Sequence, residues 1–207
     1  HLATRTAALD ALSKSVSRDL EVLKSSPALA QALNSFVAGW TDLGEEPETT
    51  LRRLYVAENP HPARKRDHLE HADDASLYSV AHSFYHPRLR RHRELMGYSD
   101  LLLVTPNGLV IYSVAKANEF ARELAGHAFR GEPVRNAFET IRDAPERSFA
   151  FSDLAVSHRL GTREVVGAVA STFTRPDGAL LGYVIIVLDD NALNIALAHG
   201  VGFGATG

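Results

Sequence analysis

The 207-residue sequence contains no cysteine, one methionine, one tryptophan and only four lysines beside eighteen arginines. The lack of a thiol excludes disulfide frameworks, haem attachment through Cys-x-x-Cys-His, thiolate zinc sites and cysteine nucleophiles. No segment approaches the roughly 18 apolar residues that span a bilayer, and the longest apolar run, 179–188, contains Gly182. A net charge of −3 favours neither nucleic acid nor a membrane surface as a partner.

Two hairpin patterns are the most informative feature that is present. The first spans 101–114 and turns at Pro106-Asn107-Gly108, and the second spans 165–188 and turns at Pro176-Asp177-Gly178. Proline presets φ and glycine supplies a positive φ, so both turns have a physical basis. With a short strand expected at 148–152, the order hairpin, helices, strand, hairpin predicts an α+β fold with a PAS-like antiparallel sheet.

Helical patterns precede and interrupt this sheet. One apolar stripe at helical spacing predicts a long first helix, through Leu9, Leu12, Val16, Leu20 and Leu23. Pro27 opens a second helix, and a short one is expected at 48–57 within the polar segment 41–76. Helix returns at 77–96, where Pro87 is expected to bend or restart it. Further helical patterns cover Phe120 to Ile141 and 192–199.

The predicted organisation therefore has three parts. Residues 1–76 form an N-terminal helical lead and insert, residues 77–199 form the PAS-like module, and residues 200–207 form a Gly-rich connector. The first helix is either a plain core-facing helix or a stalk that continues from a membrane anchor. Because the chain starts at His1 with no signal-peptide pattern, we expect it to be an excised part of a longer protein.

Three short motifs suggest catalysis or cofactor binding, and each lacks its required context. Gly202 to Gly207 fits G-x-G-x-x-G, but it follows a predicted helix rather than a strand. Ser113-Val-Ala-Lys116 fits S-x-x-K without the companion motifs of penicillin-recognising enzymes. His82 and His86 have metal-ligand spacing, but Pro87 disturbs the helix and no carboxylate accompanies them. We expect no cofactor, no metal and no catalytic residue.

A basic and aromatic patch follows in the third long helix. Its candidate ligand-binding residues are Tyr85, His86, Arg88 and Arg91. An arginine beside apolar side chains either snorkels to solvent or presents a forked donor to a carboxylate. Nucleic acid is a poor fit, because the whole chain is acidic and no base-stacking motif accompanies the patch.

Tyr112, Lys116 and Asp153 are the remaining candidates. Tyr112 is expected to share a strand face with Val110 and Val114, and Lys116 follows where the chain turns over the sheet. A phenol and an ammonium beside an apolar floor suit an anionic ligand. Asp153 is expected to orient Lys116 or to accept from a ligand amine. The alternative for each is a purely structural role.

The stretch from Tyr85 to Lys116, with its order of Gly-Tyr-x-Asp, apolar run, Pro-x-Gly, apolar run and Tyr-x-Val-x-Lys, resembles the extracytoplasmic Cache sensor regions of bacterial chemoreceptors and sensor kinases. The resemblance continues through Phe149-Ala-Phe-Ser-Asp153 and Pro176-Asp-Gly-Ala-Leu-Leu-Gly-Tyr-Val. It covers roughly residues 77–207. The closing Gly-x-Gly-Ala-Thr-Gly is similar to the run that leads from one sensor module into the next.

This resemblance implies a periplasmic or extracellular sensor domain of a membrane-anchored receptor, with a small-molecule pocket above the sheet and no activity of its own. The seven candidates would line that pocket. The Tyr/Arg/Trp/Tyr/Asp signature of amino-acid-binding Cache domains is missing, which favours a small carboxylate. A homodimer through the N-terminal helix is possible. A structural or protein-interaction module and an enzyme are the alternatives, and the output module (methyl-accepting, kinase or cyclase) stays open.

Overall fold

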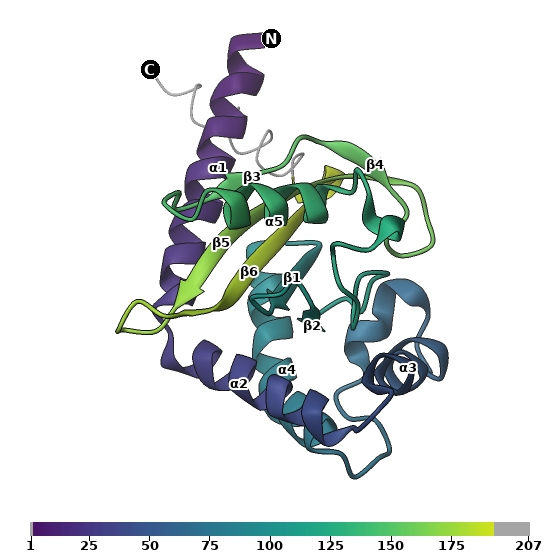
Figure 1. The fold of residues 1–207 in the computed structure, drawn as a ribbon. Helices are drawn as coiled ribbons and strands as arrows, with labels where there is room; N and C mark the ends of the chain where they lie inside the picture. The colour runs from purple at the N-terminus through teal and green to yellow at the C-terminus, as the bar shows by residue number, and fades with distance from the viewer. Residues whose placement is uncertain (1, 193–207) are drawn as a thin grey trace.

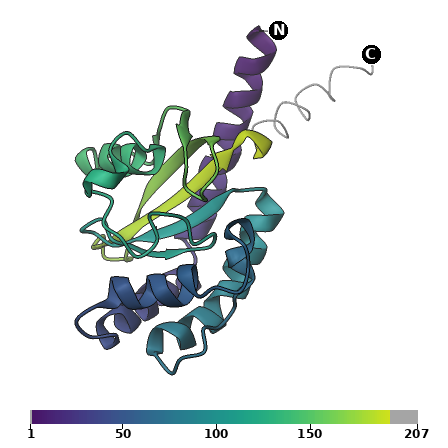
Figure 2. The ribbon, with the colours of Figure 1, turned by 90° about the vertical axis from the view of Figure 1, so that its right-hand side faces the viewer.

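The computed structural model describes residues 2–192 and arranges them as an antiparallel sheet between two unequal layers of helices (Figure 1). Helices α1 (Leu2–Lys24), α2 (Pro27–Asp42) and α4 (Leu77–Met96) pack on one face, and α5 (Pro133–Asp143) packs on the other. The turned view separates the two layers and shows α1 extending past the sheet (Figure 2). Within residues 2–192, no helix is long and apolar enough to cross a membrane.

The sheet confirms the predicted fold class, α+β with a PAS-like antiparallel sheet. Its order is β2-β1-β6-β5-β3, every pairing is antiparallel, and β4 also pairs with β5. Both predicted hairpins form, the expected strand at 148–152 shrinks to two residues, and β4 was not predicted. The strands are β1 (Asp100–Val104), β2 (Val110–Ser113), β3 (Ala150–Phe151), β4 (Ala155–Ser157), β5 (Glu164–Thr174) and β6 (Leu180–Asp189).

One detail of the first hairpin differs from the expectation. The register between β1 and β2 shifts between Leu103 and Val104, so Leu103 pairs with Tyr112 but Val104 pairs with Val110. A bulge of this kind breaks the strict alternation of side chains. As a result Val110 belongs to the core under α5, whereas Tyr112 and Val114 belong to the core under α2 and α4.

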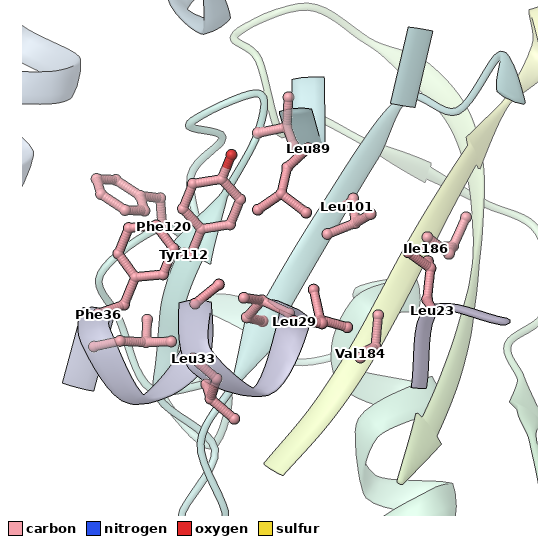
Figure 3. Packing of buried hydrophobic residues seen from close by; sticks show 14 of the residues in the cluster. Leu23, Leu29, Leu33, Phe36, Leu89, Leu101, Tyr112, Phe120, Val184 and Ile186 are labelled. Carbon is pink, nitrogen blue, oxygen red and sulfur yellow. The ribbon is translucent and has the colours of Figure 1, made fainter. Parts of the chain in front are cut away.

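The N-terminal helices close the larger core. Val16, Leu20 and Leu23 of α1 are buried, and α2 begins with Pro27 after the extended Ser26. Figure 3 shows Phe36 of α2 beside Tyr112 of β2, and their rings stack with centroids 4.6 Å apart. This stacking fixes α2 directly over the strand that carries Tyr112.

The polar insert belongs to the same core. It contains α3 (Pro47–Arg52), a π-helical turn η1 (Arg53–Ala57) and a 3-10 turn η2 (Ala63–His68), which together include the helix expected at 48–57. Leu51 and Tyr55 are completely buried in the cluster that also contains Leu101 and Tyr112. The insert and the sheet therefore share one core.

Helix α4 runs as one element from Leu77 to Met96, so the expected restart at Pro87 does not occur. The Ser76 side chain caps its first turn by accepting from the Ser79 amide, and Gly97, at φ +70°, ends it. His82 and His86 bind backbone carbonyls of the insert, which holds the turns around Pro87 in place.

The segment after β2 differs most from the sequence-based expectation. Residues 115–126 are irregular, and between them and β3 lie the 3-10 turn η3 (His127–Phe129) and α5. The backbone of this segment forms isolated turns, such as Phe120 N to Ala117 O, and also pairs with the edge of the sheet: the Ala121 amide donates to Val110 O at 2.9 Å, and Leu109 bridges Glu123. Apart from Ala192, the helix expected at 192–199 lies outside the described residues, as does the connector at 200–207.

Candidate functional site

Lys116 has an unusual position at the end of β2. Its backbone is left-handed, with φ +55°, and its side chain has no exposed surface. Two contacts hold the backbone: the Lys116 amide donates to Ser113 Oγ at 2.8 Å, and Arg66 donates to Lys116 O at 3.3 Å. Residues other than glycine avoid this conformation, and those that keep it in buried positions are concentrated at functional sites.

The Lys116 ammonium lies inside an aromatic box formed by Tyr55, Tyr112 and Phe120. Nζ is 4.6 Å from the Tyr112 ring centroid, 5.4 Å from that of Phe120 and 5.8 Å from that of Tyr55. The Ser113 carbonyl accepts a hydrogen bond from Nζ. Burial lowers the pKa of Lys116 to about 7, although the charges of Asp100 and Asp67 oppose this shift. The cation therefore relies on aromatic faces and one carbonyl.

Two neutral histidines of α4 form the next layer of the site. His86 Nε2 is 2.7 Å from Asp67 O, which can only accept, so Nε2 carries the proton and Nδ1 accepts from the Tyr112 hydroxyl at 2.6 Å. Burial, with Lys116 nearby, lowers the pKa of His86 to about 2. His82 stacks on His86 with centroids 4.2 Å apart and donates from Nδ1 to Glu70 O. Its buried Nε2 has no hydrogen-bond partner in the described part of the chain.

Arginines on the inner side of α4 fix the insert over this layer. Arg93 pairs with the buried Asp67 carboxylate, and Arg90 donates to Asp67 O at 3.4 Å. Outside this pair lies an open cleft of about 300 Å³, whose lining includes Arg64, Asp67, Arg93 and Ala115. The cleft therefore borders both the Asp67–Arg93 pair and the residue before Lys116.

A second buried network lies on the other side of Lys116. Asp100 accepts from four donors at 2.8–2.9 Å: the amides of Leu101 and Ala115, Ser113 Oγ and Arg159 Nη2. Arg159 also binds Glu119, donating through Nε at 2.6 Å and through Nη2. Burial raises the pKa of Glu119, and Arg159 opposes that shift. Asp100 thus joins Arg159 to the loop that holds Lys116.

The structure brings together three of the seven predicted site residues: His86, Tyr112 and Lys116. Tyr85 is half-buried and, with the exposed Arg88, lines an apolar cleft of about 180 Å³ between α1, α2 and α4. Arg91 is exposed on the outside of α4. Asp153 does not orient Lys116, because it is exposed after β3 while the lysine is buried against Ser113.

Sequence reasoning missed Asp67, Asp100, Glu119 and Arg159. Helical spacing from His86 does point to the inner arginines, because Arg90 and Arg93 lie one and two turns further along the same side of α4. Asp100 had a weaker signal, as a carboxylate at the start of an otherwise apolar strand. Arg159 had none, since its partners lie 40 and 59 residues away in the sequence.

The side chains of the S-x-x-K motif have separate partners. Ser113 Oγ donates to Asp100 at 2.8 Å, while Lys116 Nζ donates to the Ser113 carbonyl. Across the part of the chain that the structure describes, no group of three or more His, Asp or Glu side chains is arranged to hold a metal ion.

Comparison with known proteins finds likeness among solved structures. No family model and no curated protein sequence matches the chain. Among solved structures, the sensor domain of the histidine kinase DctB from V. cholerae superposes with a TM-score of 0.42 and 14% identity. The match covers 82% of this chain and 59% of that one. A likeness at this level concerns the arrangement of the chain and says nothing about its ligand.

Proposed function

We propose that this chain is the extracytoplasmic ligand-sensing domain of a membrane-anchored signal-transduction receptor of the chemoreceptor type, and that its ligand is a small carboxylate. The observation that carries the proposal is the Lys116 ammonium, which is fully buried and hydrogen-bonded to a single carbonyl. A buried charge is costly unless it is paired, and a carboxylate is the partner that this ammonium lacks. The left-handed backbone of Lys116 adds local strain where a ligand would act.

The polar cleft outside Asp67 supports an entry route. Its rim carries Arg64 and Arg93, and the buried Arg93 Nε has no hydrogen-bond partner among residues 2–192. The Asp67 carboxylate now occupies the position beside Arg93 that a ligand carboxylate would take. We therefore expect binding to replace the Asp67–Arg93 pair and to move the 63–70 segment relative to α4.

A chain of contacts runs from this site to α1. Asp19 of α1 accepts from the Tyr98 hydroxyl at 2.9 Å and lies 2.9 Å from His92 Nε2 of α4. A ligand that shifts α4 would therefore bias the position of α1, the helix that extends past the sheet (Figure 2). The size of this shift is limited by the difference in ligand affinity between the two arrangements.

Thermal unfolding in the presence of small carboxylates, amines, amino acids and sugars tests this proposal. A ligand at 100 times its dissociation constant adds about 2.7 kcal/mol to the free energy of unfolding. We expect a carboxylate to raise the melting temperature of the wild type and of Lys14→Met, in which an exposed lysine is removed, but not of Lys116→Met. A carboxylate that stabilises Lys116→Met equally would contradict the assignment of the site.

A structural or protein-interaction module is the second candidate, and one observation favours it. Lys116, Tyr112 and Phe120 are all without exposed surface, so the lysine itself fills the aromatic box. In that case every compound in the panel leaves the melting temperature unchanged, and the box serves to fix the insert to the sheet.

A further inference from the structure

A separate small cavity lies between the loop at 117–119, η3, the start of α5 and the turn between β4 and β5. Its volume is about 60 Å³, roughly the share of two water molecules in the liquid. Its apolar lining comes mainly from Leu124, Phe129 and Val134, and its polar lining from Asn118, Glu119, Glu132, Arg135, His158 and Arg159. None of these residues belongs to the aromatic box.

The cavity is held open by contacts between its walls. The Asn118 amide donates to Arg159 O, and its side chain donates to His158 O, both at 3.0 Å. Arg135 Nη1 donates to Gly126 O at 3.0 Å, which ties α5 to the loop before η3. The lining is therefore fixed before any ligand arrives, which lowers the ordering cost of binding.

Two lining residues keep unused hydrogen-bonding groups. Arg159 is only 3% exposed, and its Nε and Nη2 donate hydrogen bonds to Glu119 and Asp100. Its Nη1 has no hydrogen-bond partner within the described residues. Glu132 Oε2 is likewise buried and unpartnered. A buried donor and a buried acceptor without partners are costly, so a ligand that serves both is favoured.

The charges around the cavity narrow the class of ligand. The positive charge of Arg159 is balanced by Glu119 and Asp100, and that of Arg135 is balanced by Glu139. The carboxylate of Glu132 therefore makes the net charge around the cavity negative. A second anion would be repelled, whereas a neutral group can accept from Arg159 and donate to Glu132. We propose that this cavity binds a small neutral molecule with a hydrogen-bond acceptor beside a donor, as in a primary carboxamide or urea. This inference does not rest on the proposed carboxylate site.

Acetamide and acetate are the matched probes, because they have the same shape and differ in charge and in donor groups. We expect acetamide, titrated into the ¹⁵N-labelled protein, to shift the backbone amide signals of residues 118–119, 132, 134–135 and 158–159 saturably. Acetate at the same concentrations should leave them in place. Tighter binding of acetate than of acetamide, or no saturable shift with acetamide up to about 100 mM, overturns the proposal.

Two variants separate binding from folding. Glu132→Ala removes the free acceptor but no capping bond, because the Glu132 side chain makes no cap hydrogen bond to α5. We expect acetamide affinity to fall about tenfold. Ala128→Met, at the exposed rim, should block entry, and Glu146→Ala, an exposed change outside the lining, is the control. Unchanged affinity in both Glu132→Ala and Ala128→Met would overturn the assignment of the cavity.

Discussion

Lys116 sets how the stability of this fold depends on pH. Its pKa is lowered to about 7 in the folded state, against 10.5 for an ordinary lysine, so between these values the unfolded chain binds the extra proton. The free energy of unfolding should therefore rise with pH between about 7 and 10.5, by on the order of 4 kcal/mol. Chemical denaturation of Lys116→Met at pH 7 and pH 10 should lack this rise. An identical rise in Lys116→Met would contradict the position of the ammonium.

His86 has the same effect at acid pH. Its pKa in the folded state is about 2, against 6.5 for an ordinary histidine, so the unfolded chain binds the proton between these values. Stability is therefore fully present above pH 6.5 and is lost as the pH falls toward 2. In His86→Gln, the number of protons taken up on unfolding between pH 2 and 6.5 should fall by about one, which lowers the slope of the free energy of unfolding against pH. An unchanged slope would mean that His86 is solvated rather than buried.

The site residues that could be predicted from the sequence are those whose contacts lie close to them in the chain. Tyr112 and Lys116 stand four positions apart at the end of one strand, and their proximity follows from the hairpin itself. The outer arginines were preferred to Arg90 and Arg93, because the side of α4 that faces the insert depends on a distant contact with Asp67. The predicted contact between Asp153 and Lys116 is absent for the same reason, because no local sequence pattern indicates which loop lies beside Lys116.

Among the elements, the crossing of α2 and α4 depends on Gly39. A Cβ added at Gly39 would lie 2.5 Å from Tyr78 Cα, and the clash is with backbone, which cannot rotate away. Alanine normally stabilises a helix relative to glycine by about 1 kcal/mol, but Gly39→Ala should lower the free energy of unfolding by about 1–3 kcal/mol. Denaturant titration measures this directly.

Asn34→Ala on the exposed side of α2 is the matched control. It should leave stability unchanged or slightly raised, because alanine has the higher helix propensity. If Gly39→Ala were as stable as this control, α2 and α4 would cross elsewhere.

The elements with strong periodicity were predictable, and those that pair with a strand edge were not. Both hairpins follow from turn residues between apolar runs, and α1, α2 and α4 follow from apolar stripes with capping signals. The pattern from Phe120 to Leu124 has helical spacing, yet the Ala121 amide donates to Val110 of β2 and the Leu124 amide donates to Gly108 in the preceding turn, because an open strand edge offers acceptors to the segment beside it.

At the scale of the whole molecule, the buried polar groups connect the layers of the fold. Asp100 lies at the centre, since it binds Arg159 from the β4–β5 turn and Ser113, whose carbonyl holds Lys116. The Tyr112 ring contacts the Lys116 ammonium, and its hydroxyl donates a hydrogen bond to His86 of α4. Lys116 and its immediate partners therefore contact the sheet, the insert and α4, and the proposed sensing role depends on these contacts.

The most direct test is to follow the side-chain ¹⁵N signal of Lys116 by NMR, with and without small carboxylates. Only four lysines are present, so each signal can be assigned by substitution. We predict one lysine that titrates near 7 in the free protein, and a ligand carboxylate that raises its pKa by stabilising the ammonium. A Lys116 signal that no carboxylate moves, at concentrations up to about 10 mM, would contradict the account of this domain as a carboxylate sensor.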